Sequence, residues 1–173
     1  DQQRLLGCNQ CPLNHAQLIH PKIPPSGATK PIIYVLGESP GKVEDEEGIQ
    51  FVGSSGQLLR DRIPAKWEKR IRWNNVIRCH PKNNRDPDPL ELACCRKQQE
   101  MDIEKSKPAV IAGFGNAPLE WMLGPDRQIS NWRGRRCPVK IGSHVCWFYP
   151  ITHPAALLRS MHDKKKGQAY LRA

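Results

Sequence analysis

Residues 31–53 read PIIYVLGESPGKVEDEEGIQFVG, and this stretch indicates how the chain folds. The first six residues are mostly apolar and predict a buried strand at 31–36. The strand leads into a segment at 37–53 that holds four glycines and five of the 17 acidic residues of the chain. A solvated acidic loop is the simplest interpretation. The alternative is a functional loop at the end of a strand, because the aromatic Phe51 closes the segment.

Patterns typical of strands and helices alternate outward from this strand. We expect strands at 31–36, 74–78, 109–113 and 145–150, helices at 55–62, 90–105 and 116–123, and short helical segments after His153 and near the C-terminus. Such alternation predicts an α/β fold with a parallel sheet covered by helices on both faces. Ligands of these sheets bind at the carboxyl ends of the strands. The acidic segment, the residues after 74–78 and THPAALLRS at 152–160 therefore converge there.

The composition favours a polyanionic partner. The 173 residues carry 27 Lys and Arg and a net charge of +10, which indicates nucleic acid, although a merely soluble basic protein is the alternative. The length fits one domain over 1–173. The chain has no apolar run of 18 residues and no signal-peptide pattern, so we expect no membrane contact and a cytoplasmic location. The sequence starts without Met, and we leave open that it is one domain of a longer protein.

Cysteine usage predicts a metal site. Seven cysteines are an odd count, which argues against a pure disulfide framework. Cys8 and Cys11 form a C-x2-C pair, Cys79 follows a predicted strand, and Cys95 lies 16 positions later at the start of a predicted helix. Four such thiolates suit zinc or an iron–sulfur cluster, and spacing alone does not choose between them. The remaining cysteines are expected to be buried or incidental thiols: Cys94, Cys137 and Cys146.

Five segments together suggest a family. They are CNQCPL (8–13), GESPGKVEDEEGIQFVGSSGQLL (37–59), NNVIRCHPKNNRDP (74–87), ELACCRKQQ (91–99) and THPAALLR (152–159). In order and spacing they resemble the family 4 uracil-DNA glycosylases, the iron–sulfur enzymes of the uracil-DNA glycosylase superfamily. The resemblance runs over nearly the whole chain, from Cys8 to about Arg159.

The resemblance implies a fold and a cofactor. The expected architecture is a three-layer sandwich with a central four-stranded parallel sheet between helices. A cysteine-bearing N-terminal segment is expected to close a [4Fe–4S] cluster. The implied ligands are Cys8, Cys11, Cys79 and Cys95, with Cys95 preferred to Cys94 because it directly precedes the Arg of the ACR pattern of the family.

The resemblance also implies a reaction. The enzyme would flip uracil out of DNA and hydrolyse its N-glycosidic bond in base-excision repair, leaving an abasic site. Phe51 is expected to stack on the flipped base. The amide of Asn75 is expected to donate to O4 of uracil and accept from N3–H, which rejects cytosine because cytosine presents the reverse pattern. His153 is expected to donate to O2 and stabilise the leaving uracil.

The acidic segment gains a role in this scheme. Gly37 lets the backbone approach the base, with Glu38 and Ser39 beside it. A carboxylate there stabilises the sugar cation and orients water. Glu38 is the first candidate and Asp45 the second. Ser39 departs from the family, which usually has Ala at this position, and its role stays open.

DNA contacts are expected on two segments. Small residues and backbone amides at the start of the helix at 55–62 form a natural phosphate seat. After His153, a leucine is placed to fill the gap left by the flipped base, and an arginine to contact the backbone. The residues expected to touch DNA are Ser55, Gly56, Gln57, Leu157 and Arg159.

Other functions stay open at this point. A non-catalytic DNA-binding module of a larger replication or repair protein is the main alternative, whereas a redox protein would need a second cofactor site that the sequence lacks. The basic segment AKWEKRIRWNN (65–75) contains no His, so covalent attachment to DNA is not predicted. The expected partner is uracil-containing DNA, single- or double-stranded. We expect a monomer, with fusion to or binding of other replication or repair proteins left open.

Overall fold

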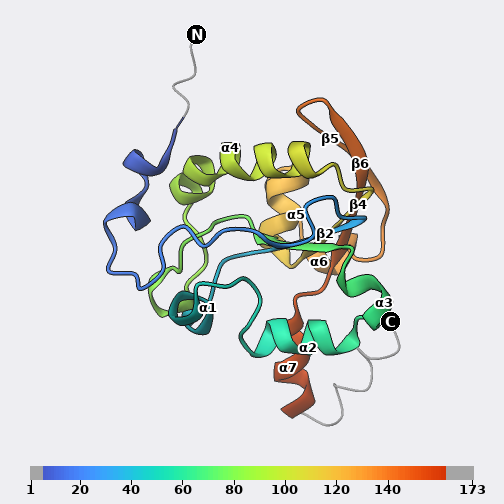
Figure 1. Ribbon diagram of the computed structural model, residues 1–173, viewed down its shortest axis with the longest axis horizontal. Helices are drawn as coiled ribbons and strands as arrows, with labels where there is room; N and C mark the ends of the chain where they lie inside the picture. The colour runs from blue at the N-terminus through green and yellow to red at the C-terminus, as the bar shows by residue number, and fades with distance from the viewer. Residues whose placement is uncertain (1–5, 163–173) are drawn as a thin grey trace.

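The computed structural model describes residues 6–162, and a six-stranded sheet forms its centre (Figure 1). The strand order is β1-β3-β2-β4-β6-β5. The strands are β1 (Ser26–Gly27), β2 (Ile33–Gly37), β3 (Ile71–Asn75), β4 (Val110–Phe114), β5 (Cys137–Ile141) and β6 (His144–Ile151). The outer parts of the predicted domain, 1–5 and 163–173, and the helical segment expected near the C-terminus lie outside the described residues.

The prediction of a four-stranded parallel sheet is correct only for the four middle strands of the observed sheet. Strands β3, β2, β4 and β6 run parallel, as predicted. The sheet is nevertheless mixed, because β1 pairs antiparallel with β3 at one edge and β5 pairs antiparallel with β6 at the other. Strand β1 has only two residues, too few to give a sequence pattern. Strand β5 returns into β6 through a tight turn at Gly142, where φ is +57°.

Helices cover both faces of this sheet. They are α1 (Lys42–Glu47), α2 (Ser54–Arg62), α3 (Ala65–Glu68), α4 (Pro89–Ser106), α5 (Asn116–Leu123), α6 (Ile129–Trp132) and α7 (Pro154–His162). Three short 3-10 helices complete the described chain: η1 (Cys8–Gln10), η2 (Pro12–His15) and η3 (Lys82–Asn84). None of the helices within 6–162 is long and apolar enough to cross a membrane.

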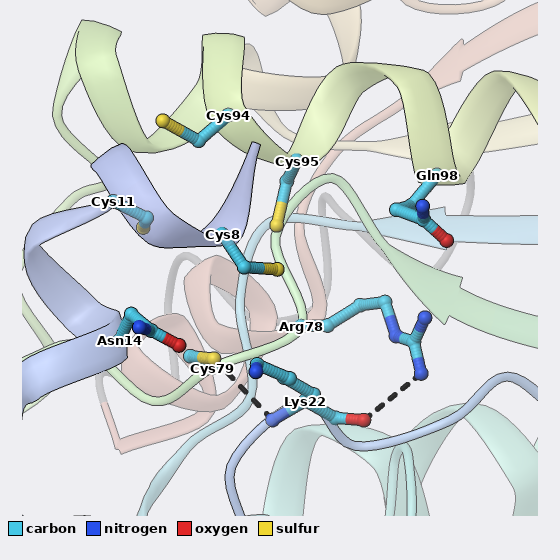
Figure 2. A pocket seen from close by; sticks show the side chains of 9 residues that line it. All are labelled: Cys8, Cys11, Asn14, Lys22, Arg78, Cys79, Cys94, Cys95 and Gln98. Atoms are coloured by element: carbon cyan, nitrogen blue, oxygen red, sulfur yellow. Dashed lines mark hydrogen bonds between the residues drawn. The ribbon is translucent and has the colours of Figure 1, made fainter. Parts of the chain in front are cut away.

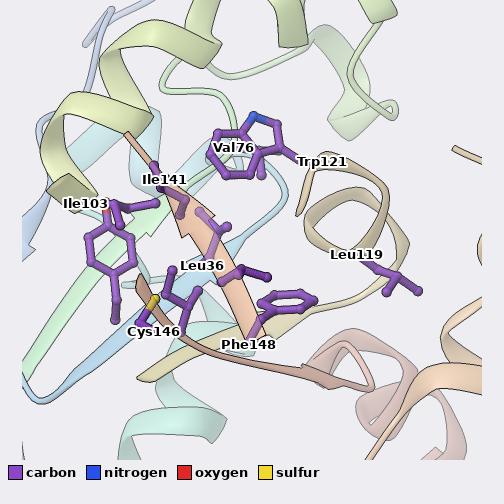
Figure 3. Packing of buried hydrophobic residues seen from close by; sticks show 11 residues of the cluster. Leu36, Val76, Ile103, Leu119, Trp121, Ile141, Cys146 and Phe148 are labelled. Atoms are coloured by element: carbon purple, nitrogen blue, oxygen red, sulfur yellow. The ribbon is translucent and has the colours of Figure 1, made fainter. Parts of the chain in front are cut away.

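The alternation of side chains along each strand builds two cores. Tyr34, Leu36 and Phe148 face Ile103 of α4 and Trp121 of α5, and Figure 3 shows members of this cluster packed together. On the opposite face the strand residues pack against α2 and α3, through Val35, Trp73, Leu59 and Trp67 among others. The central strands are thus buried on both sides, as parallel strands usually are.

Two sequence predictions need correction. The acidic segment is not all loop, because 42–47 forms α1. The strand predicted at 74–78 is β3, which begins and ends three residues earlier. Val76 and Ile77 extended the apolar pattern because they are buried just beyond the strand end. Asn75 is therefore the last residue of β3, and it lies opposite Gly37, the last residue of β2.

A capping arrangement fixes the start of α4, the longest helix. The Glu91 carboxylate accepts a hydrogen bond from the backbone N–H of Asp88 at 2.9 Å. It also forms an ion pair with Arg85, Nη2 to Oε1, at 2.5 Å. Glu91 is fully buried, and these contacts satisfy its charge. The first turns of α4 are thereby held in place, and they carry Cys94 and Cys95.

Candidate active site

A cleft of about 680 Å³ lies where the four parallel strands end. Each strand contributes a residue at or just after its carboxyl end: Glu38 follows β2, Asn75 ends β3, Gly115 follows β4 and His153 follows β6. Helices α2 and α7 lie side by side along one flank of this region (Figure 1). The cleft thus occupies the position that the parallel topology predicts for a ligand site.

The structure brings most of the predicted residues to this cleft. Those that line it are Glu38, Ser39, Phe51, Asn75, Ser55, Gly56, His153 and Arg159. Four predicted residues do not line it: Gly37, Asp45, Gln57 and Leu157. Gly37 lies beneath the floor, where a β-carbon would come within 2.6 Å of Cζ of Phe51 and still closer to Oδ1 of Asn75. A glycine there allows these two side chains to sit next to the strand end.

The Asn75 side chain is held by a residue that the sequence did not indicate. Nδ2 of Asn75 donates to Oε1 of Gln50 at 2.6 Å. Gln50 is fully buried, and its own Nε2 donates to the backbone carbonyl of Ile23 at 3.0 Å. The backbone N–H of Asn75 donates to Oδ1 of Asn74 at 2.9 Å. Both the backbone and the amide of Asn75 are therefore fixed.

Phe51 adopts a backbone conformation that is rare for an aromatic residue, with φ at +58°. Arg60 supports it: Nε donates to the carbonyl of Phe51 at 3.0 Å, and Nη2 donates to that of Gln50 at 3.1 Å. The guanidinium also stacks on Trp73, 4.2 Å from the ring centroid. The Phe51 and Trp73 rings lie 5.3 Å apart, tilted by 50°. Arg60, which was not predicted, thus holds the backbone of Phe51 and packs on the Trp73 ring that contacts the Phe51 ring.

His153 can be assigned a tautomer from its contacts. The backbone N–H of Ala155 donates to Nδ1 of His153 at 3.1 Å. Nδ1 is therefore an acceptor, and the proton of the neutral ring lies on Nε2. Burial lowers the pKa of His153 from its ordinary value, and the charge of Arg159 lowers this pKa further. The ring is thus a neutral N–H donor at pH 7. Gly115 packs against it, where a β-carbon would meet Cβ of His153 at 3.3 Å.

Glu38 is an acidic residue that lines the cleft directly after β2. Burial raises the pKa of its carboxyl above the ordinary value, and the nearby Asp86 raises this pKa further. Both carboxylates line the cleft. A carboxylate in this environment is partly stripped of water, which strengthens its interaction with a positive charge that develops nearby.

The neighbouring acids serve the fold. The Glu44 carboxylate accepts from the backbone N–H groups of Gly41 at 3.1 Å and Gly53 at 2.7 Å, so it connects the start of α1 with the end of the acidic segment. The Asp45 carboxylate accepts from the N–H groups of Ile19 and His20, both at 3.1 Å. Because Asp45 is buried in these contacts and does not reach the cleft, we do not keep it as a catalytic candidate.

The predicted DNA contacts divide between the cleft and its surroundings. Ser55 lies in the first turn of α2 at the cleft, and Arg159 is exposed on α7. Gly56 has a packing role, because a β-carbon there would collide with the backbone of Phe51. Gln57 is exposed next to the cleft and its Nε2 donates to the carbonyl of Val52 at 3.4 Å. Leu157 is half-buried on α7.

A second cavity, of about 270 Å³, is lined by cysteines. All four predicted ligands line it, together with Cys94: Cys8, Cys11, Cys79 and Cys95. Cys8 lies in η1, Cys11 between η1 and η2, Cys79 beyond β3, and Cys94 and Cys95 in α4, and all are free thiols. Figure 2 shows the sulfur atoms of Cys8 and Cys95 close together in the view, whereas that of Cys94 points away from them. The Cys94 side chain instead interacts with that of Cys11, so side-chain directions alone do not choose between Cys95 and Cys94.

The protonation of these thiols follows from burial. Burial raises the pKa of Cys95 to about 11 and also raises the pKa of Cys79. The backbone N–H of Lys22 donates to Sγ of Cys79 at 3.3 Å. Within residues 6–162, no three Cys, His or acidic side chains meet as a single metal ion requires. A cluster places fewer demands on mutual closeness, because each thiolate binds a different iron.

Comparisons with known proteins agree with this α/β fold. The family model of the uracil DNA glycosylase superfamily matches residues 24–173. The type-4 uracil-DNA glycosylase of Thermotoga maritima is 33% identical over 165 residues, which cover 94% of this chain and 83% of that protein. That of Pyrobaculum aerophilum is 32% identical over 161 residues, with coverage of 88% and 80%. That of Archaeoglobus fulgidus is 30% identical over 162 residues, with coverage of 90% and 80%.

The fold and the cleft thus define an α/β protein with a cleft at the carboxyl ends of its parallel strands. The chain belongs to the uracil-DNA glycosylase superfamily and, within it, to the type-4 uracil-DNA glycosylases.

Proposed function

We propose that the protein removes uracil from DNA by hydrolysing the bond between the base and its sugar. The observation that carries this proposal is the pairing, in one cleft, of a fixed amide at Asn75 with a neutral N–H donor at His153. These groups match the two edges of uracil that an enzyme must address. One edge identifies the base, and the carbonyl at O2 takes up negative charge as the base departs.

Base recognition would use Phe51 and Asn75. The flipped uracil stacks on the Phe51 ring, which contributes about 1–3 kcal/mol for such a base–aromatic contact. One N–H of the Asn75 amide is engaged by Gln50, and the other is free to donate to O4 of uracil. Oδ1 of Asn75 accepts from N3–H. Gly37 makes room for both side chains at the end of β2, while Ser39 lines the cleft beside Glu38.

Bond cleavage would use His153 and Glu38. The transition state carries positive charge on the sugar and negative charge on the departing uracil. The Nε2–H of His153 donates to O2, and removal of one such donor typically costs about 2.7–4 kcal/mol of transition-state stabilisation. The Glu38 carboxylate stabilises the sugar cation and orients the attacking water. The products are free uracil and an abasic site.

The substrate would be held by the basic surface around the cleft. Ser55 and the amides at the start of α2 suit one phosphate, and Arg159 on α7 suits another. Gln57 and Leu157 are close to the same flank, and we propose that they contact the DNA strand on either side of the extruded nucleotide. DNA is the partner that the net charge of +10 favours, and we propose a monomer acting inside the cell.

The cysteine cavity fits an iron–sulfur cluster. We propose that Cys8, Cys11, Cys79 and Cys95 hold a [4Fe–4S] cluster, because they line one cavity and are too dispersed for one metal ion. Bound there, the cluster would tie the N-terminal segment and the chain after β3 to α4. No step of the proposed reaction uses it. A structural role also suits a cavity that is separate from the cleft.

The decisive experiment measures release of uracil. The protein is incubated with an oligonucleotide that contains one uracil, and alkali then cleaves the strand at any abasic site. We expect scission at the uracil and none in a matched oligonucleotide with thymine. The main alternative, a DNA-binding module, predicts a bound oligonucleotide that stays intact, and this result would refute the proposal.

A further inference from the structure

The further inference concerns Gln50, which lies below the cleft and does not line it. Its side chain is fully buried and makes two hydrogen bonds in opposite directions. Nε2 donates to the carbonyl of Ile23 at 3.0 Å, and Oε1 accepts from Nδ2 of Asn75 at 2.6 Å. Hydrogen bonds thus connect these three groups in series, from the backbone near β1 to the side-chain amide at the end of β3.

These two hydrogen bonds can point in only one direction. A backbone carbonyl only accepts, so Gln50 must turn its NH₂ group toward Ile23 and its oxygen toward Asn75. Asn75 must then turn its own NH₂ group toward Gln50. If the Asn75 amide rotated by half a turn, two oxygens would face each other across the 2.6 Å contact. Gln50 cannot rotate to relieve this clash, because its oxygen would then face the carbonyl of Ile23.

We propose that Gln50 is a specificity-determining positioning residue, which locks the Asn75 amide in the orientation that reads uracil and so excludes cytosine. The inference rests on the proposed function. Cytosine has an amino group at position 4 and an unprotonated N3, which only the rotated amide of Asn75 can pair with. Rotation of the Asn75 amide would leave buried polar groups of Asn75 and Gln50 without hydrogen-bond partners. The free-energy cost of such unpaired groups gives strong discrimination against cytosine.

The role of the Gln50 side chain can be tested without moving the backbone of Asn75. The Asn75 backbone is held separately, by Oδ1 of Asn74 at 2.9 Å. The backbone of Gln50 is also held separately, because Nη2 of Arg60 donates to its carbonyl at 3.1 Å. A change confined to the Gln50 side chain therefore leaves both backbones with their anchors and releases only the amide.

The first variant is Gln50→Leu, which removes both hydrogen bonds and puts an apolar side chain of similar size in the place of the amide. The measurement is the ratio of single-turnover excision rates for uracil and cytosine at the same site in one oligonucleotide. We expect this ratio to fall by about tenfold, as befits the loss of one hydrogen bond of ordinary net strength. The ratio is taken on one preparation, so the fraction of folded protein cancels. A ratio equal to that of the parent overturns the inference.

The second variant is Gln50→Glu, whose carboxyl still accepts from Asn75. Burial favours the neutral form, which also donates to the carbonyl of Ile23. We expect the parent ratio to be kept. A purely structural role for Gln50 predicts the same ratio in both variants and changes only in thermal stability. If Gln50→Leu does not fold, a folded Gln50→Glu variant that loses selectivity overturns the inference by itself.

Failure of the proposed function would look different. A parent protein that releases no uracil refutes that function before any variant is compared. Asn75→Ala serves as the benchmark, because it should abolish most uracil excision if Asn75 reads the base. Loss of excision in Asn75→Ala together with an unchanged ratio in Gln50→Leu refutes only the role of Gln50.

Discussion

His153 shows how one backbone contact decides the chemistry of a side chain. The amide of Ala155 occupies Nδ1 and burial lowers the pKa, so the neutral ring offers Nε2–H to the cleft. Substitution His153→Ala should lower the single-turnover rate of uracil release by about a hundredfold or more. DNA affinity, measured by fluorescence anisotropy, should stay nearly unchanged, because the ring acts on the departing base. An equal loss of rate and affinity would assign His153 to DNA binding instead.

The pKa of Glu38 predicts the acid side of the pH profile. The carboxylate is the active form in the proposed reaction, and burial raises its pKa above the ordinary value of 4.5. The single-turnover rate should therefore fall with decreasing pH already above pH 4.5, and recover as pH rises through the raised pKa. Substitution Glu38→Gln should lower the rate by about a hundredfold and remove this limb of the profile. An acid limb that persists unchanged in Glu38→Gln would show that another group controls it.

Some residue roles were visible in the sequence and others were not. Glu38, Asn75 and His153 stand beside predicted strand ends, where topology alone directs them to the cleft. Gln50 and Arg60 act through contacts with Ile23, Asn75 and Phe51 that only the folded chain creates. Asp45 shows the converse case, because its carboxylate accepts hydrogen bonds from the backbone at Ile19 and His20, contacts that the sequence does not indicate.

Among the elements, α4 carries two residues of the cysteine cavity, Cys94 and Cys95, directly after its capped first turn. Substitution Cys95→Ser should remove most of the iron and the visible absorption, because Cys95 faces Cys8 in the cavity. Cys94→Ser is the matched control: Cys95 is the proposed ligand, so Cys94 should be dispensable although its side chain contacts Cys11. Parent protein should contain about four irons per chain by metal analysis. Zinc without sulfide, or an equal loss in both variants, would contradict the assignment.

The elements themselves could be predicted in part. Long segments with strong patterns, such as α4 and α5, were expected within about a residue of their observed bounds. The three-residue shift of β3 arose because Val76 and Ile77 are buried although the strand has ended. The acidic helix α1 has only six residues, too few to give a helical periodicity, so the sequence indicates a loop there although Glu44 caps the helix start through the backbone N–H of Gly41.

At the scale of the whole molecule, the net charge of +10 predicts strongly salt-dependent DNA binding. If about three phosphates are neutralised, affinity should fall by one to two orders of magnitude between roughly 50 and 200 mM salt. Substitution Arg159→Gln should reduce the slope of log affinity against log salt by about one. Lys97→Gln is the control, because Lys97 is exposed on α4 and does not line the cleft. Affinity that is flat with salt would contradict a phosphate-binding surface.

The two antiparallel edge strands have a consequence for how copies of the protein behave toward one another. An open sheet edge is a template on which another chain can add a strand and start aggregation. Here one edge is β1, with only two residues, and the other is β5, which exposes Pro138 and Lys140. Proline lacks the N–H for pairing, and lysine repels a second basic chain. Crowded or refolding copies should therefore resist edge-to-edge association, although the central strands β2 and β4 are rich in apolar residues.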